Sequence, residues 1–289
     1  MSTGIHPLPY LAIDLGGSKT RLGLFPSLDT PDFTSLGDFP TQTSYADQLG
    51  RIASVVKEQG IAGLAGAGVS VAARVARDGR SIVFGPNVPE YLDRPFADDL
   101  EARLRCPVRL GHDTVCGLLG EKRFGSLRDV ERAAYLTAST GTGAAIQLGK
   151  GEMALTSSIE IGHQILDGNE RLCLCGQVGC LETFTGGRQL ELRYGRPIAE
   201  FADMSFWQVF VSKLALGLLN LAQLTRIDAV AVGGAIALQN DFLLPMLQEK
   251  LDELLKGTRL LLLRAKLEAH APLVGAASLL ATPEERILH

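Results

Sequence analysis

Cysteine is scarce in this chain, and its few copies are unevenly placed. Only five of the 289 residues are cysteines, and three of them lie between positions 173 and 180. An odd number of cysteines argues against a complete disulfide framework. The N-terminal MSTGIHPLPY lacks a basic segment followed by an apolar core, so we expect no secretory signal. We therefore expect a cytoplasmic, reducing location, where clustered cysteines more often bind metal or take part in redox chemistry.

Charge of one sign and long apolar runs are also lacking. The net charge is −4 at pH 7 and the pI is about 5.8, so electrostatics favour neither nucleic acid nor an anionic membrane as a partner. The most apolar stretch, VFVSKLALGLLNLAQL, is interrupted by Lys213 and Asn220. It is too short to span a bilayer, so we interpret it as a buried helix. The length and the 46% of hydrophobic residues suffice for one large or two medium domains.

The hydrophobic pattern predicts a similar order of elements twice. The first half contains a strand, glycine turn and strand in YLAIDLGGSKTRLGLFP, then a third strand in FTSLGDFP, a helix over about 44–59, the short strands LAGAGVSV and PVRLGHD, and the helix TVCGLLGEKRFG. The second half begins with the hairpin AAYLTASTGTGAAIQLG and continues with the cysteine segment, a helix over about 205–225, the strand AVAVGG, the helix NDFLLPMLQEKLDELLKG, the strand RLLLLRA and the helix PLVGAASLLAT. This order predicts a duplicated α/β unit with a cleft between the halves.

Three glycine turns are candidates for a nucleotide site. They contain Asp14, Gly16, Gly17, Ser18, Lys19 and Thr20 in the first, Thr140, Gly141, Thr142 and Gly143 in the second, and Gly233 and Gly234 in the third. Glycine lets backbone N–H groups approach a phosphate closely, and the hydroxyls add donors. The first two turns are neither P-loops nor Rossmann turns, and each taken singly fits a structural hairpin turn better. Their matching places in the two halves favour a nucleotide, with two turns for its phosphates and the third for its adenosine.

The cysteine segment is a candidate metal site. His163, Cys173, Cys175 and Cys180 supply one imidazole and three thiolates, which is a donor set that zinc prefers in tetrahedral sites. Buried thiols beside an unrelated histidine are the alternative, but three cysteines within eight residues, with Gly176 and Gly179 between them, favour metal. An iron–sulfur cluster fits less well, because it normally takes four cysteines. Four protein ligands leave no position for water, so we expect a structural zinc ion.

Two carboxylates flank the predicted zinc ligands. Glu160 precedes His163 by three residues, and Glu182 follows Cys180 by two. One ring nitrogen of His163 can bind zinc and leave the other for a hydrogen bond. An imidazole and two carboxylates on a rigid loop suit the recognition of hydroxyl groups, whereas solvated surface glutamates are the alternative.

The run EIGHQILDGNERLCLCGQVGCLET resembles the signature of the ROK family of repressors, open reading frames and sugar kinases. That signature is a histidine, nine residues, then Cys-x-Cys-Gly-x-x-Gly-Cys-x-Glu, and this chain agrees with it at every position. DLGGSKT, STGTG and AVAVGG look like the two phosphate motifs and the adenosine motif of the family, in the right order. The resemblance extends from about Tyr10 to Ala281.

The resemblance implies an actin-like (ribonuclease H-like) α/β ATPase fold and ATP-dependent phosphorylation of hexoses or their N-acetyl derivatives. Asp113 would be the general base that takes the proton of the sugar hydroxyl, although a helix cap is its alternative role at this strand-to-helix junction. The sugar would be held by Asn87, His112, Asp113, Glu160, His163 and Glu182. Asp14 and the glycine turns would serve ATP with Mg²⁺. The family also implies a homodimer, whose surface the helices of the second half could supply.

The same resemblance implies two domains. Residues 1–113, with a C-terminal helix over about 272–289, would form the smaller domain, and residues 114–271 would form the larger domain with the zinc loop.

The chain departs from the family pattern at two places in the expected sugar site. His112 stands where the family has Asn, and Ser70 and Val71 stand where it has a Pro-Gly pair. Glucose is the expected substrate as the commonest one, with a fructokinase or N-acetylmannosamine kinase as alternatives. A non-catalytic sugar- or nucleotide-binding protein is another. A ROK repressor is not expected, because about nine residues precede the first strand and a helix-turn-helix does not fit there.

Overall fold

The computed structural model describes residues 7–85, 88–149, 151–257 and 259–289. The chain forms two compact units. Unit 1 consists of Met1–Phe124 and His270–His289, and unit 2 consists of Gly125–Ala269. The predicted boundary at residue 113 precedes helix α3, which lies in unit 1. We describe each unit by itself.

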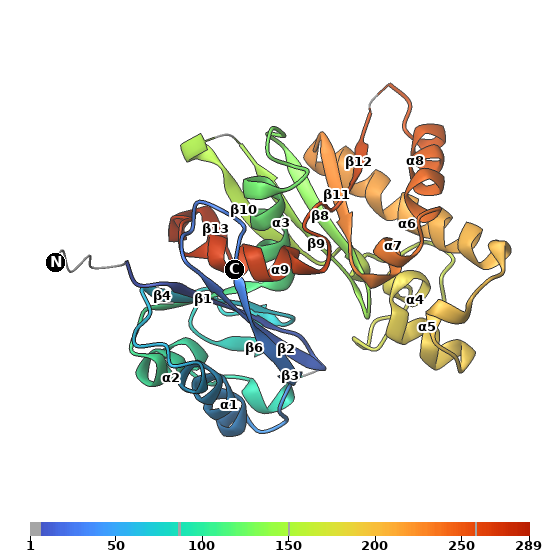
Figure 1. The fold of residues 1–289 in the computed structure, drawn as a ribbon. Helices are drawn as coiled ribbons and strands as arrows, with labels where there is room; N and C mark the ends of the chain where they lie inside the picture. Colours follow the sequence, from blue (N-terminus) through green and yellow to red (C-terminus); the bar gives the residue numbers. More distant parts are fainter. Residues whose placement is uncertain (1–6, 86–87, 150, 258) are drawn as a thin grey trace. The chain divides into compact units, whose positions relative to one another are not determined.

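The sheet of unit 1 has the strand order β3-β2-β1-β4-β7. These strands are β1 (Tyr10–Leu15), β2 (Lys19–Phe25), β3 (Thr34–Pro40), β4 (Gly66–Val71) and β7 (Val108–His112). Figure 1 labels β1, β2, β3 and β4 of this sheet. β1, β2 and β3 are antiparallel neighbours, whereas β4 lies parallel to both β1 and β7. Every residue of β4 is buried, as expected for a central strand of a parallel sheet.

Helices cover the sheet of unit 1. They are α1 (Tyr45–Glu58), α2 (Phe96–Leu104), α3 (Asp113–Phe124) and α9 (Ala271–Leu279). Unit 1 also contains 3₁₀ turns at Pro89–Tyr91 and Glu284–Arg286 and the short strands β5 (Arg74–Val75), β6 (Ile82–Phe84) and β13 (Ile287–Leu288), and a further 3₁₀ turn, Glu268–His270, spans the point in the sequence where unit 2 ends. α1 begins after Ser44, whose hydroxyl accepts a hydrogen bond from the backbone N–H of Asp47. The buried side chains of α1 and α2 join those of the strands in one hydrophobic core.

The sheet of unit 2 repeats the topology of the first. Its strands have the order β12-β11-β8-β9-β10 and comprise β8 (Ala133–Ala138), β9 (Thr142–Leu148), β10 (Leu155–Ile159), β11 (Ala229–Gly233) and β12 (Leu261–Arg264). β8, β9 and β10 are antiparallel neighbours, and β11 is parallel to both β8 and β12. The same order and directions in both units confirm the predicted duplication.

The longest helix of unit 2 is α6 (Met204–Thr225). Its 22 residues are long and apolar enough to cross a membrane, so the prediction that this region is too short was wrong. The prediction of a buried helix agrees with its packing, because Trp207, Phe210, Leu214 and Leu218 lie in the core of unit 2. The remaining helices are α4 (Glu182–Thr185), α5 (Gly187–Tyr194), α7 (Ala235–Gln239) and α8 (Leu243–Leu254), with 3₁₀ turns at Gly151–Met153, Ile161–His163 and Ile198–Glu200.

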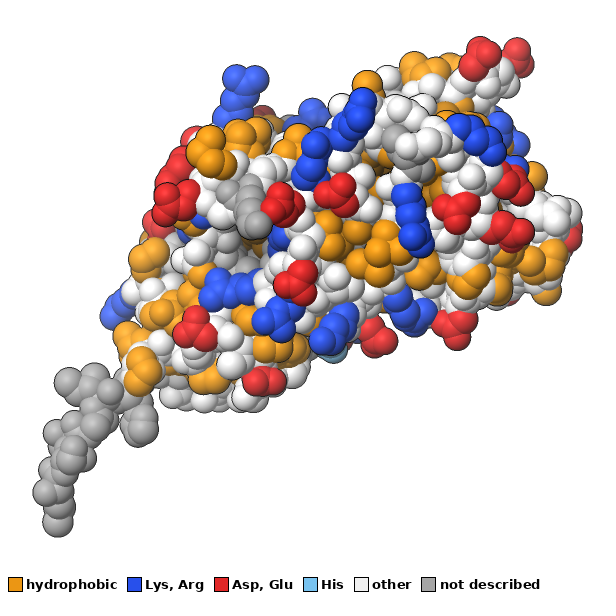
Figure 2. Space-filling view, turned by 90° about the horizontal axis from the view of Figure 1, so that it is seen from above, with side chains coloured by type: hydrophobic (Ala, Val, Ile, Leu, Met, Phe, Trp, Pro, Cys, Tyr) orange, Lys and Arg blue, Asp and Glu red, His pale blue; other side chains and the backbone are white. Residues whose placement is uncertain are grey.

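The described surface carries mixed charge. Figure 2 shows Lys and Arg side chains interspersed with Asp and Glu on the face drawn, and no broad field of one sign gathers among the described side chains there. This distribution matches a net charge of only −4.

Two glycines allow α9 to pack closely within unit 1. A Cβ atom at Gly275 of α9 would lie 1.7 Å from the carbonyl oxygen of Cys116 in α3. A Cβ atom at Gly68 of β4 would lie 1.8 Å from the carbonyl oxygen of Ala276. Both clashes are with backbone atoms, which cannot rotate away as a side chain can. The closeness of α9 to α3 and β4 therefore depends on these two glycines.

We expect Gly275→Ala to lower the free energy of unfolding by about 2–4 kcal/mol, because α9 must shift away from α3. Gly50→Ala is the matched control, since Gly50 lies within α1 and a Cβ atom there meets nothing within 4 Å. The control should gain about 0.5–1 kcal/mol from the better helix propensity of alanine. Urea unfolding of both variants measures the difference. Equal stabilities would contradict the close packing of α9.

Candidate functional site

The first glycine turn connects β1 to β2 in unit 1. Its backbone is closed by a hydrogen bond of 3.0 Å from Gly16 N to Lys19 O. Gly17, Ser18 and Lys19 are exposed, and the Lys19 ammonium pairs with Asp38. Thr20 is instead fully buried. Its hydroxyl accepts a hydrogen bond from the amide of Gln48 in α1, so this side chain anchors the turn to the core.

Asp14 lies at the end of β1, beside Ser70 of β4 in the parallel register. The hydroxyl of the fully buried Ser70 donates a hydrogen bond of 3.2 Å to Asp14 Oδ1, and Arg21 lies 3.7 Å from Oδ2. Burial raises the pKa of Asp14 to about 6; Arg21 opposes this shift, and the charge of Asp113 adds to it. Unit 1 therefore places two carboxylates within electrostatic reach of each other.

Asp113 is the first residue of α3, directly after β7. Its Oδ1 accepts a hydrogen bond of 2.7 Å from the backbone N–H of Thr114 and lies 2.9 Å from Nδ1 of His112. The hydroxyl of Thr114 lies 2.8 Å from the same ring nitrogen. Both side chains are partly exposed, at 24% for His112 and 29% for Asp113. The carboxylate thus contacts the N-terminus of its own helix and keeps access to solvent. Asn87, predicted to bind sugar with these two residues, lies outside the described residues.

The second glycine turn, STGTG, connects β8 to β9 in unit 2 and rests on α4 and α5. The backbone N–H groups of Gly187 and Arg188 donate hydrogen bonds of 2.9 Å to the carbonyls of Ser139 and Thr140. The N–H of Thr142 donates to Glu182 Oε2 at 2.8 Å. The third turn joins it, because a Cβ atom at Gly234 would lie 2.4 Å from the carbonyl oxygen of Ala138. Unit 2 therefore brings the second and third predicted nucleotide turns together.

Glu182 is held in a pocket that three glycines leave open. Cβ atoms at Gly141, Gly162 and Gly186 would lie 2.9, 2.6 and 2.6 Å from its carboxylate oxygens. Burial raises the pKa of Glu182 to about 7, the hydrogen bond from Thr142 opposes the shift, and the charge of Glu160 adds to it. Glu160 is more exposed and lies 4.0 Å from Nε2 of His163.

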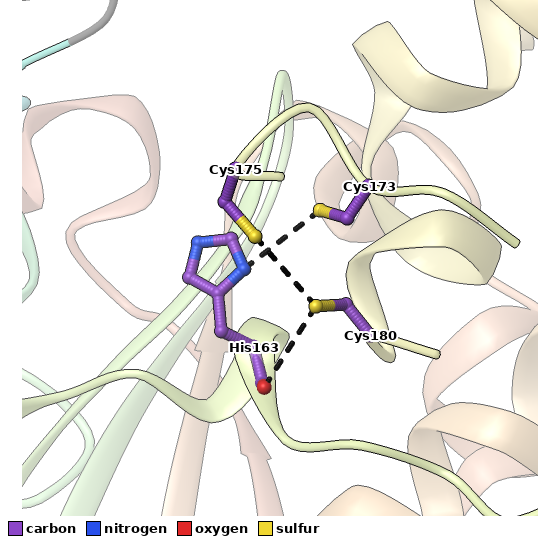
Figure 3. A group of neighbouring side chains, drawn as sticks. All are labelled: His163, Cys173, Cys175 and Cys180. Carbon is purple, nitrogen blue, oxygen red and sulfur yellow. Dashed lines mark hydrogen bonds between the residues drawn. The ribbon is translucent and has the colours of Figure 1, made fainter. Parts of the chain in front are cut away.

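The predicted zinc ligands form one cluster (Figure 3). The ligand atoms of His163, Cys173, Cys175 and Cys180 all lie within 4.8 Å of one another. Cys173 Sγ is 3.9 Å from His163 Nδ1, and Cys175 Sγ is 3.7 Å from Cys180 Sγ. A tetrahedral zinc ion with bonds of about 2.0–2.3 Å places its ligand atoms about 3.5–3.8 Å apart. The donor set and these separations therefore fit zinc.

Two glycines shape the cysteine segment. Gly176 and Gly179 have φ angles of +91° and +95°, which other residues rarely adopt. They return the chain so that Leu172 pairs with Val178, and Ile165 with Cys180, in isolated β-bridges. Burial raises the pKa of both Cys173 and Cys180, which favours the protonated thiols. Because a metal ion binds the thiolate, binding of a cation would release these protons.

Some contacts at these sites were not anticipated from the sequence. Thr185 binds the second turn through its hydroxyl, 2.8 Å from that of Thr142, and the amide of Gln189 contacts Cys173 Sγ at 3.1 Å. Ser70, which departs from the family pattern, donates a hydrogen bond to Asp14. The position of Thr185 three residues after Glu182 was the available signal, since both then face one side of a helical turn.

The ROK family model matches residues 10–282 of the chain. A glucokinase of Streptomyces coelicolor is 25% identical over 95% of this chain and 98% of its own length. A protein of Caldicellulosiruptor sp. named as a xylose repressor is 28% identical over 64% of this chain, and the match spans only 54% of that protein. Among solved structures, a ROK family glucokinase from Streptomyces griseus, in complex with glucose and AMPPNP, has a TM-score of 0.77 at 22% identity, covering 94% of this chain and 98% of that one. The predicted actin-like α/β fold is confirmed.

The raised pKa of Asp14 predicts a pH-dependent stability. Above pH 6 the carboxylate of Asp14 is ionised in both states, but it is buried in the folded protein and surrounded by water in the unfolded chain, where its pKa is near 3.8. This cost reduces stability as the pH rises from about 4 to 6 and then stays constant. Asp14→Asn should therefore raise the free energy of unfolding at pH 8 by about 1–3 kcal/mol, and the gain should shrink toward zero near pH 4.

Asp38→Asn is the control of opposite sign. Its bond to Lys19 lowers the pKa of this exposed carboxyl, so its ionised form favours the folded state. This variant should gain no stability at pH 8. Urea unfolding of the two variants between pH 4.5 and 8 measures both effects. An Asp14→Asn variant no more stable than wild type at pH 8 would contradict the assigned burial cost.

Proposed function

Because the chain belongs to the ROK family, we propose that it is an ATP-dependent sugar kinase that phosphorylates a hydroxyl of a hexose or N-acetylhexosamine. The observation that carries the proposal is the carboxylate of Asp113 at the start of α3, partly exposed and in the same unit as Asp14. The Streptomyces coelicolor glucokinase, matched over nearly its full length, supports the same activity. Glucose, giving glucose 6-phosphate, is the proposed substrate, with fructose or N-acetylmannosamine as alternatives.

In this proposal unit 1 supplies the base. Asp113 accepts the proton of the sugar hydroxyl as it attacks the γ-phosphoryl group of ATP, and the hydrogen bond from Thr114 orients its carboxylate. His112 and Asn87 contact the sugar. Asp14, whose carboxylate accepts a hydrogen bond from Ser70, would serve the Mg²⁺ ion bound with ATP, and that ion would neutralise charge on the phosphates.

Unit 2 supplies the second and third nucleotide turns and the remaining sugar contacts. The STGTG turn takes phosphates and the Gly233–Gly234 turn takes the adenosine. Glu160, His163 and Glu182 contact the sugar hydroxyls. His163, Cys173, Cys175 and Cys180 hold a structural zinc ion that rigidifies the segment carrying these groups.

The proposal includes a cytoplasmic location and a homodimer. A reducing compartment would keep the cysteines as zinc ligands. Exposed apolar side chains on α6, such as Val209 and Leu224, would suit a subunit interface.

A sugar-binding protein without turnover is the second candidate function. The replacements at Ser70, Val71 and His112 favour it, because they fall in the expected sugar site. The match to part of a xylose repressor also fits a sugar-binding role.

ADP release over a panel of hexoses and N-acetylhexosamines tests the proposal. The wild-type protein should release ADP with at least one sugar. Asp113→Asn should lower that turnover about a hundred- to ten-thousandfold, because an amide cannot accept the proton. Its melting temperature and its sugar affinity should stay close to those of the wild type.

Asp129→Asn is the matched control, since Asp129 is an exposed residue of the loop after α3. It should turn over at the wild-type rate. ADP release near the wild-type rate in Asp113→Asn would leave Asp113 only the role of a helix cap. No ADP release with any sugar in the wild type would favour the non-catalytic candidate.

A further inference from the structure

Residues of α4 hold the backbone of the STGTG turn from one side. Glu182 Oε2 accepts the hydrogen bond from Thr142 N at 2.8 Å, and the hydroxyl of Thr185 is 2.8 Å from that of Thr142. Both threonine hydroxyls are buried, so water cannot replace either partner. The two contacts fix the residue at which the turn enters β9.

The carboxylate of Glu182 lies close to three glycines, one of which belongs to the turn. Its carboxylate fills the space that Gly141, Gly162 and Gly186 leave by lacking side chains. A Cβ atom at Gly162 would also lie 2.4 Å from the carbonyl oxygen of Thr142. The carboxylate of Glu182 therefore lies against Gly141 of the turn, Gly162 before His163 and Gly186 after α4.

α4 is in turn fastened to the cysteine segment. The carbonyl of Cys180 accepts hydrogen bonds from the hydroxyl of Thr183 at 2.8 Å and from the amide of Asn169 at 3.1 Å. The same amide bonds the Thr183 hydroxyl at 3.1 Å. A continuous series of contacts thus leads from the cysteine cluster through α4 to the second glycine turn, all within unit 2.

We propose that Glu182 and Thr185 are positioning residues for the nucleotide, which hold the STGTG turn in its phosphate-binding form and so make the cysteine segment a support for nucleotide binding as well as for the sugar. This inference rests on the proposed kinase function. It adds to the sugar contact proposed for Glu182, because a sugar contact alone predicts weaker sugar binding with nucleotide binding unchanged. Thr185 separates the two roles, since its buried hydroxyl binds Thr142.

The test combines two variants and two binding measurements. In Thr185→Val and Glu182→Ala, calorimetry measures AMPPNP affinity with Mg²⁺ but without sugar, and glucose affinity without nucleotide. We expect the Kd of AMPPNP to rise about three- to tenfold in Thr185→Val, because the lost hydroxyl makes two hydrogen bonds, to Thr142 and to the carbonyl of Leu181, and the first of these reaches the turn. Glucose affinity should stay unchanged in Thr185→Val. Thr185→Ser keeps the hydroxyl and should restore the wild-type Kd.

Hydrogen–deuterium exchange of the protein without ligand measures the turn itself. The amides of residues 139–148 should exchange faster in both variants than in the wild type. Thr225→Val is the matched control, because its hydroxyl bonds a carbonyl at the end of α6 in the same unit. It should leave exchange of the turn and both affinities unchanged, and zinc content should be equal in all variants.

Unchanged exchange and unchanged AMPPNP affinity in both variants would overturn the inference, as would a loss confined to glucose affinity. Since exchange needs no ligand, it reports on the turn whatever the protein binds. A wild-type protein that binds no AMPPNP would instead refute the proposed kinase, and with it the nucleotide role assigned to these residues.

Discussion

The candidate site of unit 2 is built around one constraint, because the potential ligand atoms of His163, Cys173, Cys175 and Cys180 all lie within 4.8 Å of one another. The chain between His163 and Cys180 has little hydrophobic burial to hold it. Ile165, Leu172, Leu174 and Val178 are exposed at 64, 69, 61 and 51%. Burial of apolar surface is the main stabilising contribution in most folds, so this segment needs another. A structural zinc ion contributes on the order of 10 kcal/mol in small zinc-binding peptides, which would suffice.

Helix α4 links the cysteine segment to the STGTG turn through Glu182. Glu182 follows the last cysteine by two residues, and its carboxylate reaches the N–H of Thr142, forty residues earlier in the chain. A buried carboxylate is costly unless it is hydrogen-bonded. The raised pKa of Glu182 expresses this cost. Thr142 donates a hydrogen bond to the carboxylate of Glu182, and Gly141, Gly162 and Gly186 leave space for it. A side chain at any of these three glycines would occupy that space.

The local elements were largely predictable. The helix expected over about 44–59 is found at Tyr45–Glu58, because Ser44 and the apolar spacing are local signals. The helix expected over about 205–225 is found at Met204–Thr225 for the same reason. β10 and α2 were missed. β10 has an exposed or partly exposed pattern with one buried residue, and α2 has no side-chain cap to mark its start.

The contacts that position the candidate site could not be predicted, since they join residues far apart in sequence. Ser70 reaches Asp14 across 56 positions through the pairing of β1 with β4. Gly234 packs against Ala138 because β11 lies beside β8. The grouping of His163 with the three cysteines was the exception, because these four residues lie within eighteen positions and their spacing alone predicts that they lie close together.

We infer that the STGTG turn depends on the cysteine cluster for its conformation, and removal of the metal tests this dependence. Hydrogen–deuterium exchange of residues 139–148 is measured in the protein with zinc bound, after a chelator has removed it, and after zinc is restored. We expect about one zinc per chain, because four protein ligands complete a tetrahedral site, and we expect the turn to exchange faster after zinc is removed and to recover when zinc is restored. A turn that exchanges at one rate in all three states would contradict it.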